Sequence, residues 1–590
     1  MGKNSIIVYM KNFFNDLNLN RKDSIYLLAL SIFSILLTVN LIEVNYSLNF
    51  KPDSFVYFVN ALVYAGMEGN IQNYAYSMFL TPVVSFLTSL LFRWEIVDKI
   101  AIMIVTGVIA IFGEIGLYLL LKNRFNSVYS LFGCILFASF EIILTFWGNG
   151  GIDLPVCNFA IFTILFIVIA VNKNPKYYIL TSIFLILAIF TKYDALFLIP
   201  LLLLYYLSKH DPFNLLDLAL GNREEFKKVT MDYLKSKEFK YLMVSILLGA
   251  VLFMLFCEVI WSFGSNLTFI TQSQEAMNGF HSFEAYKSTF FNSDKYVYIN
   301  TFYSFFYPKI SKEASYIIPL IILIGTIFNF AHVLKERTDY HIVKEYNVPY
   351  FKYIIIAMIL ILTYFLVNEF ESSHMDTNIR FLVICVCILS LAGRINLKNK
   401  DNFDLDILFL AWIFIFTVFF SFITIKGYRY LIIAMPPVVY FVLRSIEEIF
   451  FRFKDSKMVH IALIIIMVCL AFYCLTYTFE DSVLVDEMNN TALQDVYDHL
   501  VEYDSDYISK NICSEYSYGA RFGNWTLKKD VKYIKRRDLA DSNMDYIISK
   551  DELHKANYTE IYKSGEIRLY QNVIWQKNNT YKKYKRWSRR

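Results

Sequence analysis

The stretch LPVCNFAIFTILFIVIAV (residues 154–171) contains no charged side chain. As a helix it is long enough to cross the hydrocarbon core of a bilayer, which is about 30 Å thick. Similar apolar runs recur along the chain, whereas the strands of a membrane β-barrel alternate apolar and polar residues over about ten positions. The pattern therefore predicts a polytopic α-helical membrane protein.

The overall composition leads to the same class of protein. Of the 590 residues, 56% are hydrophobic and 18% are charged, which is more apolar side chain than a soluble domain can bury. The net charge of +4 gives no indication of a nucleic-acid partner. Seven of the eight cysteines fall inside apolar runs, and no cysteine pair has the spacing of a zinc site or of a disulfide framework.

The apolar runs predict about thirteen transmembrane helices. We expect them near residues 24–44, 100–121, 128–146, 154–171, 177–190, 194–207, 241–262, 316–334, 353–367, 380–393, 405–425, 430–450 and 459–478. Lysine and arginine are concentrated in the loops on the side of the N-terminus, which predicts that the N-terminus is cytoplasmic. An odd number of crossings then places the chain after residue 478 outside a plasma membrane.

The polar tail, residues 479–590, has a different character from the transmembrane part, residues 1–478. The stretch TALQDVYDHLVEY (491–503) is patterned like a helix, and YIIS (546–549) and EIRLYQN (566–572) are patterned like strands. We therefore expect a small extracytoplasmic α/β domain.

The first outer loop, 45–99, contains the stretch KPDSFVYFVNALVYAG (51–66). Apolar residues recur there at helical spacing, and Tyr57, Asn60 and Tyr64 point to another side, which predicts a helix lying in the membrane interface. Asp53 stands at the start of this helix. It is either an N-cap or a carboxylate that acts as a base or positions a metal ion.

Three more charged residues occur at the outer ends of predicted spans. Asp153 lies in WGNGGIDLP (147–155), Lys192 in FTKYDALFLIP (190–200), and Arg429 in IKGYRYLIIAMPP (425–437). Taken singly, the acid is explained as a helix cap and the two cations as side chains that reach the interface. Together with Asp53, they predict a site for a phosphate-bearing lipid beside a nucleophile that must lose a proton.

Further candidate residues lie in the outer loops and at their edges. Tyr57 and Tyr428 neighbour Asp53 and Arg429 and are possible substrate contacts. Glu275 and His281 belong to the aromatic-rich loop 263–315, which is either a lid over the site or part of an interfacial aromatic belt.

Other acids lie outside this set. A loop with Glu369, Glu371, His374 and Asp376 is either a divalent cation site or a solvated acidic loop. Glu114 and Glu258 occur in or near apolar runs, where a carboxylate is costly, so we expect both to face the protein interior.

The order of PDSFVYFVNALVYAG, GGIDLP, FTKYDALFLIP and GYRYLIIAMPPVV, followed by a polar tail, resembles the GT-C superfamily of membrane glycosyltransferases. The branch it resembles contains the dolichyl-phosphate-mannose protein mannosyltransferases and the aminoarabinose transferases. The resemblance implies transfer of a sugar from a polyprenyl-phosphate donor to a protein, glycan or lipid acceptor at the outer face of the membrane. It implies Asp53 as the base, Asp153 as a second acid, and Lys192 and Arg429 as ligands of the donor phosphate.

The sequence departs from the pattern of this superfamily at one point that bears on a metal cofactor. Many members of this superfamily have two adjacent acids in the first loop, whereas Asp53 is followed by Ser54. This weakens the case for a divalent metal ion and leaves the question open. No WWDYG-like sequence occurs either, which argues against an oligosaccharyltransferase.

The expected chemistry is a single displacement with inversion, because a polyprenyl phosphate leaves readily once its charge is stabilised, whereas the acceptor hydroxyl needs a base. Two other classes stay open. A transporter or flippase of lipid-linked sugars also has many spans and buried charges, although transporters more often show paired halves with interrupted helices. The other class is a non-catalytic assembly partner, and such a role would not explain four charged residues at the same depth in the membrane.

Overall fold

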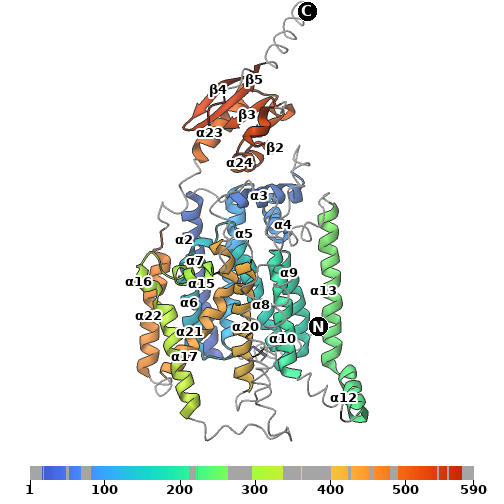
Figure 1. The fold of residues 1–590 in the computed structure, drawn as a ribbon, viewed down its shortest axis with the longest axis vertical. Coiled ribbons are helices and arrows are strands. Elements are labelled where there is room, and N and C mark those ends of the chain that lie inside the picture. The colour runs from blue at the N-terminus through green and yellow to red at the C-terminus, as the bar shows by residue number, and fades with distance from the viewer. Residues whose placement is uncertain are drawn as a thin grey trace, which may run out of the picture.

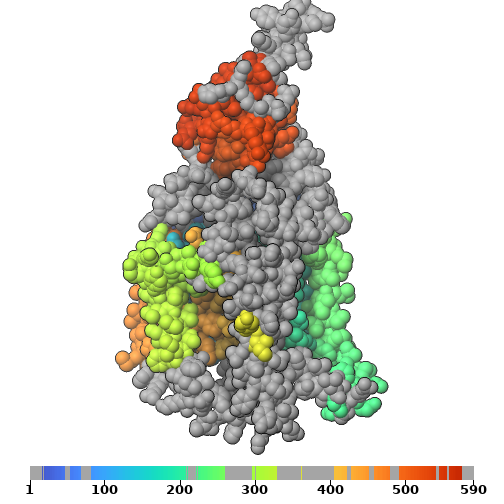
Figure 2. Space-filling model, in the orientation of Figure 1, coloured from blue at the N-terminus to red at the C-terminus, as the bar shows by residue number. Residues whose placement is uncertain are grey.

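The computed structural model describes residues 16–17, 19–47, 52–67, 81–210, 221, 223–262, 296–335, 361, 364, 400–422, 427–450, 457–478, 490–540, 544–553 and 557–573. Figure 1 shows long helices side by side, with a small sheet-containing domain at one end of the bundle. In the space-filling view of Figure 2 this domain, in red, stands beyond the helical part.

Within the described residues, seven helical segments are long and apolar enough to cross a membrane. They are α2 (Arg21–Ser47), α5 (Lys99–Leu121), α8 (Asp153–Asn172), α13 (Lys237–Ser262), α20 (Lys400–Phe422), η7 with α21 (Tyr428–Ala434 and Met435–Ile449) and α22 (Lys457–Leu475). The other helices of this part are α3 (Pro52–Ala65), α4 (Pro82–Arg93), α6 (Ser127–Ser139), α7 (Glu141–Phe146), η2 (Pro175–Tyr177), α9 (Tyr178–Ile189), η3 (Tyr193–Phe197), α10 (Leu198–His210), α12 (Arg223–Lys235), α15 (Val297–Thr301), η5 (Phe302–Phe305), α16 (Lys312–Ser315) and α17 (Ile317–Lys335).

The predicted class, a polytopic helical membrane protein, is confirmed. The number thirteen stays a prediction, because the expected span 380–393 and all of the expected span 353–367 except residues 361 and 364 lie outside the described residues. The expected span 128–146 is divided into α6 and α7. Phe140 between them has extended backbone angles, and the N–H of Glu141 donates to the carbonyl of Phe306 at 2.7 Å.

Glycines bring several of the long helices into close contact. A Cβ atom added at Gly113 of α5 would lie 2.1 Å from the side chain of Asn158 on α8. One added at Gly325 of α17 would lie 2.2 Å from Cβ of Ser445 on α21. Small residues of this kind let helix backbones approach closely in a membrane, where apolar side chains gain little by leaving lipid.

The C-terminal domain is a five-stranded mixed sheet with the strand order β2-β1-β3-β5-β4. Its elements are α23 (Asn490–Tyr503), η8 (Tyr507–Ser509), β1 (Ile512–Ser514), α24 (Ser517–Leu527), β2 (Val531–Tyr533), η9 (Arg536–Ala540), β3 (Tyr546–Ser549), β4 (Tyr558–Ser564) and β5 (Ile567–Asn572). β1 pairs in parallel with β2 and β3, while β5 pairs antiparallel with β3 and β4. The parallel pair β1–β2 is joined through α24, as a parallel connection requires a crossover.

The helix predicted in the first outer loop is α3, and it lies across the end of the bundle beside the C-terminal domain (Figure 1). We expected its tyrosines and Asn60 to face away from the apolar side. Tyr57, Asn60 and Tyr64 are instead buried along with the apolar residues. The physical reason is that α3 packs on α4 and is also covered by α24.

Candidate functional site

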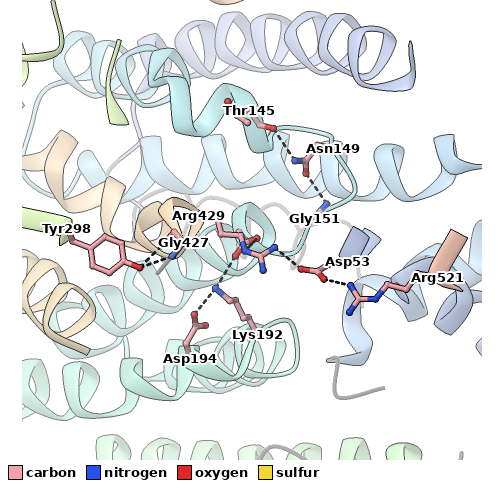
Figure 3. Close-up of polar contacts among 11 residues, drawn as sticks. Asp53, Thr145, Asn149, Gly151, Lys192, Asp194, Tyr298, Gly427, Arg429 and Arg521 are labelled. Atoms are coloured by element: carbon pink, nitrogen blue, oxygen red, sulfur yellow. Dashed lines mark hydrogen bonds and ion pairs between the residues drawn. The ribbon is translucent and has the colours of Figure 1, made fainter. Parts of the chain in front are cut away.

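Asp53 lies in the first turn of α3, and its carboxylate is held by two arginines from distant parts of the chain. Nη1 of Arg429 lies 2.9 Å from Oδ2 of Asp53, and Nη1 of Arg521 lies 2.8 Å from Oδ1 (Figure 3). Each oxygen therefore has its own guanidinium. The side chain of Asp53 is 34% exposed, so this carboxylate remains reachable.

The two guanidinium groups also determine the charge of Asp53. Burial raises the pKa of this carboxyl, but the positive charges and hydrogen bonds of Arg429 and Arg521 outweigh burial and hold the pKa below its ordinary value. Asp53 is consequently ionised near neutral pH. Asp53 is the second residue of α3, which begins at Pro52, and each of its two carboxylate oxygens pairs with one guanidinium group.

Asp153 is the first residue of α8 and follows a tight loop built from glycines. Gly148 and Gly150 have φ angles of 62° and 76°, a region that glycine enters without steric cost. Asn149 ties the loop together: its amide donates to the carbonyl of Thr145 and its oxygen accepts from the N–H of Gly151 (Figure 3). The loop delivers Asp153 to the site as the first helical residue of α8, while Ile152 occupies the N-cap position.

Lys192 precedes η3 and lies between two carboxylates. Its Nζ is 3.0 Å from Oδ1 of Asp153 and 2.9 Å from Oδ2 of Asp194. It also lies over the ring of Tyr430, 4.5 Å from the centroid. The side chains of Asp153 and Asp194 are only 4% and 9% exposed, so Lys192 neutralises two nearly buried acids.

Arg429 connects the two acids that the sequence singled out. It belongs to η7, and the preceding Gly427 is fixed by Tyr298, whose hydroxyl donates to the Gly427 carbonyl and accepts from its N–H (Figure 3). Besides its contact with Asp53, Arg429 places Nε 4.0 Å from Oδ2 of Asp153. The result is a continuous series of ion pairs in which acids and cations alternate, in the order Asp194, Lys192, Asp153, Arg429, Asp53 and Arg521.

The structure thus brings together the four residues that sequence patterns selected: Asp53, Asp153, Lys192 and Arg429. Tyr57 lies one helical turn after Asp53 and is buried, and burial together with nearby carboxylates raises its pKa well above the ordinary value. Its hydroxyl therefore keeps its proton. Tyr428 is largely exposed, with its ring edge-on to Phe305.

Sequence reasoning missed Arg521 and Asp194. Asp194 stands two positions after Lys192 in the same stretch, FTKYDALFLIP (190–200), but its role as a second partner of the lysine requires the turn of η3. Arg521 lies in the tail. Its signal was the segment SYGARFGNWTL (517–527), where Tyr518, Phe522 and Trp525 recur at helical spacing around a single arginine.

Several other predicted residues were not tested. Glu275, His281, Glu369, Glu371, His374 and Asp376 lie outside the described residues. Among the described residues, no group of three or more histidines, cysteines, aspartates or glutamates could hold a metal ion. Glu114 is buried in α5 as expected. Glu258 was expected to face the interior as well, but it is exposed near the end of α13.

The comparisons with known proteins agree with the sequence resemblance. Residues 79–216 match the family model described as dolichyl-phosphate-mannose-protein mannosyltransferase. This segment includes Asp153, Lys192 and Asp194. It confirms the resemblance to GT-C glycosyltransferases that the four motifs predicted. No curated protein sequence matches the chain.

Solved structures of two such enzymes are similar to this chain. ArnT from Cupriavidus metallidurans, bound to undecaprenyl phosphate, shares 8% sequence identity with a TM-score of 0.49, and the match covers 93% of this chain and 98% of that one. The oligosaccharyltransferase AglB from Archaeoglobus fulgidus, in complex with an inhibitory peptide and a dolichol-phosphate, shares 10% identity with a TM-score of 0.45, over 90% and 70% of the two chains.

Proposed function

We propose that the protein is a membrane glycosyltransferase that transfers a sugar from a polyprenyl-phosphate carrier to an acceptor hydroxyl on the outer face of the membrane. The observation that carries this proposal is the contact of Arg429 with both Asp53 and Asp153, which joins a candidate base to candidate phosphate ligands. The family match over residues 79–216 supports the same class of donor.

Arg429 is the strongest candidate for binding the donor phosphate. Its side chain is 35% exposed, and a guanidinium offers several donors in a planar fork that suits phosphate oxygens. Lys192 is 18% exposed and already lies between two carboxylates, which reduces its attraction for a further anion. We therefore assign direct phosphate binding to Arg429 first, with Lys192 as a second ligand that also keeps Asp153 in place.

The same contact suggests how the donor activates the base. While Asp53 is paired with two arginines, its lowered pKa makes it a weak proton acceptor. When the phosphate draws Arg429 away, Oδ2 of Asp53 is released and its affinity for a proton increases, because one of two nearby positive charges is now neutralised by the phosphate. Donor binding then precedes proton removal from the acceptor.

In the transfer step, the acceptor oxygen forms a bond to the anomeric carbon as the bond from that carbon to the phosphate oxygen breaks. The electron pair of the broken bond stays on the polyprenyl phosphate, whose added charge is stabilised by Arg429 and Lys192. The hydroxyl proton passes to Asp53. A single displacement of this kind inverts the anomeric configuration.

The decisive experiment follows the label of a sugar. Purified protein in liposomes is given a polyprenyl-phosphate carrier with a radiolabelled sugar, together with membrane extract as a source of acceptors. The proposal predicts that label leaves the carrier and appears in an acceptor. If label stays on the carrier and only changes leaflet, the protein is a flippase; if neither happens with any donor sugar, the proposed function is wrong.

A further inference from the structure

We infer that the C-terminal domain completes this site, and that Arg521 of α24 is the positioning residue that holds Asp53 when Arg429 turns to the donor phosphate. The inference rests on the proposed function. It goes beyond it by giving the extracytoplasmic domain a part in the reaction, through a residue outside the segment 79–216 that matches the family model.

The first observation is the way in which α24 rests on α3. The ring of Phe55 meets Tyr518 and Phe522 edge-on, with centroid distances of 5.6 and 5.2 Å. One turn further along α3, Phe58 stacks on Trp525 at 4.6 Å. Arg521 lies among these aromatic residues on α24, so a packed interface, rather than a loose side chain, delivers its guanidinium to Asp53.

The second observation is that the two arginines use different oxygens of Asp53. Arg429 contacts Oδ2 and Arg521 contacts Oδ1 (Figure 3). Departure of Arg429 therefore exposes one oxygen to the acceptor while the other stays anchored. Without Arg521, the carboxylate would be free to rotate in the first turn of α3, and the time it spends facing the acceptor would fall.

The third observation concerns the charged and titratable groups that face Asp53. They are Arg429 from η7, Arg521 from α24 and, on α3 itself, the hydroxyl of Tyr57; Asp153 of α8 lies beyond Arg429. Removal of Arg521 takes away one of the two positive charges that lower the pKa of Asp53. Since the base must be ionised to accept a proton, the acid limb of the rate profile should then move to higher pH.

The experiment compares Arg521→Gln, Arg521→Lys and Arg536→Gln. Arg536 is a matched control, because it lies in the same domain and pairs with Asp551 on an exposed surface. For Arg521→Gln we expect kcat to fall about tenfold or more, which corresponds to a loss of about 1.4 kcal/mol or more of transition-state stabilisation. The KM for the donor should stay unchanged, and the acid limb should move to higher pH. Arg521→Lys should recover part of the rate, and Arg536→Gln should match wild type.

Two results would overturn the inference while leaving the proposed function intact. One is transfer by Arg521→Gln with the kcat and acid limb of wild type. The other is a donor KM that rises as much as in Arg429→Gln with the acid limb unmoved, since Arg521 would then be a phosphate ligand.

If wild type shows no transfer, the rate of amide hydrogen exchange in residues 52–65 still tests the role of Arg521, separately from the proposed enzyme function. Faster exchange in Arg521→Gln than in Arg536→Gln and wild type supports the anchoring of α3 by Arg521 even if the enzyme function fails. Equal exchange in all three proteins contradicts it.

Discussion

Nη1 of Arg429 lies 2.9 Å from Oδ2 of Asp53, although 376 residues separate them in the chain. The Nε of the same guanidinium lies 4.0 Å from Asp153. One side chain thus bridges two acids that belong to the first turn of α3 and to the start of α8. An anion that binds Arg429 must compete with both carboxylates, so donor binding and the state of the base are coupled through this residue.

Replacing Arg429 tests the phosphate assignment. We predict that Arg429→Gln weakens binding of a polyprenyl phosphate by about tenfold to a hundredfold, the effect of losing a charged hydrogen bond of about 1.5–3 kcal/mol. Binding of a fluorescent polyprenyl phosphate to the purified variant measures this. Arg444→Gln is the control, because Arg444 lies in the next helix and pairs with Asp406. Equal affinity of the Arg429 variant and wild type would remove Arg429 from the donor site.

Lys192 should matter for folding as well as for activity. Lys192→Met leaves Asp153 and Asp194, both nearly buried, without their shared cation, which costs about 3–5 kcal/mol for a broken buried ion pair. We expect a markedly lower unfolding temperature in detergent, and near wild-type stability for Lys192→Arg, which keeps the charge. Wild-type stability of the methionine variant would show that the two acids do not depend on Lys192.

The ion pairs of Asp53 predict a specific pH dependence of stability. Because the folded-state pKa of Asp53 is lowered, its contribution is fully present above the unfolded value of about 3.9 and is lost as pH falls through the folded value. The difference in unfolding free energy between wild type and Asp53→Asn should be constant from about pH 5 to about pH 7. It should shrink at lower pH. A difference that grows on acidification would contradict the pairing.

Glycine contacts predict which helices tolerate a methyl group. Gly113→Ala places Cβ 2.1 Å from the side chain of Asn158, so α5 and α8 must separate, and overpacking of this kind costs about 1–3 kcal/mol. Because α8 begins with Asp153, transfer activity should fall as well. Gly221→Ala is the control, since no atom lies within 4 Å of the added Cβ. Thermal unfolding of both variants measures the difference, and equal stability would contradict close packing at Gly113.

The helical class and the charged residues at the ends of apolar runs could be predicted from sequence because each depends on a local pattern. Charge-free runs mark helices such as α8, and isolated cations such as Lys192 stand out against apolar neighbours. The division of one expected span at Phe140 could not be predicted, because it depends on a hydrogen bond from Glu141 to the distant Phe306.

Arg521 was missed for a related reason. Its sequence context is that of an ordinary amphipathic helix in a polar tail, and its importance comes from docking of α24 onto α3. The burial of Tyr57 and Asn60 has the same cause. Patterns in sequence report which face of a helix is apolar, but they do not report which distant element covers the other face.

The most direct test of the account is Asp53→Asn, with donor binding and sugar transfer measured on the same purified protein. We predict that transfer falls by about 10²–10⁴, the usual contribution of a general base, while the polyprenyl phosphate binds at least as tightly as to wild type because Arg429 no longer pairs with a carboxylate. Asp98→Asn is the control from the same segment between α2 and α5, since asparagine also caps α5. Transfer by Asp53→Asn at the wild-type rate would contradict the account.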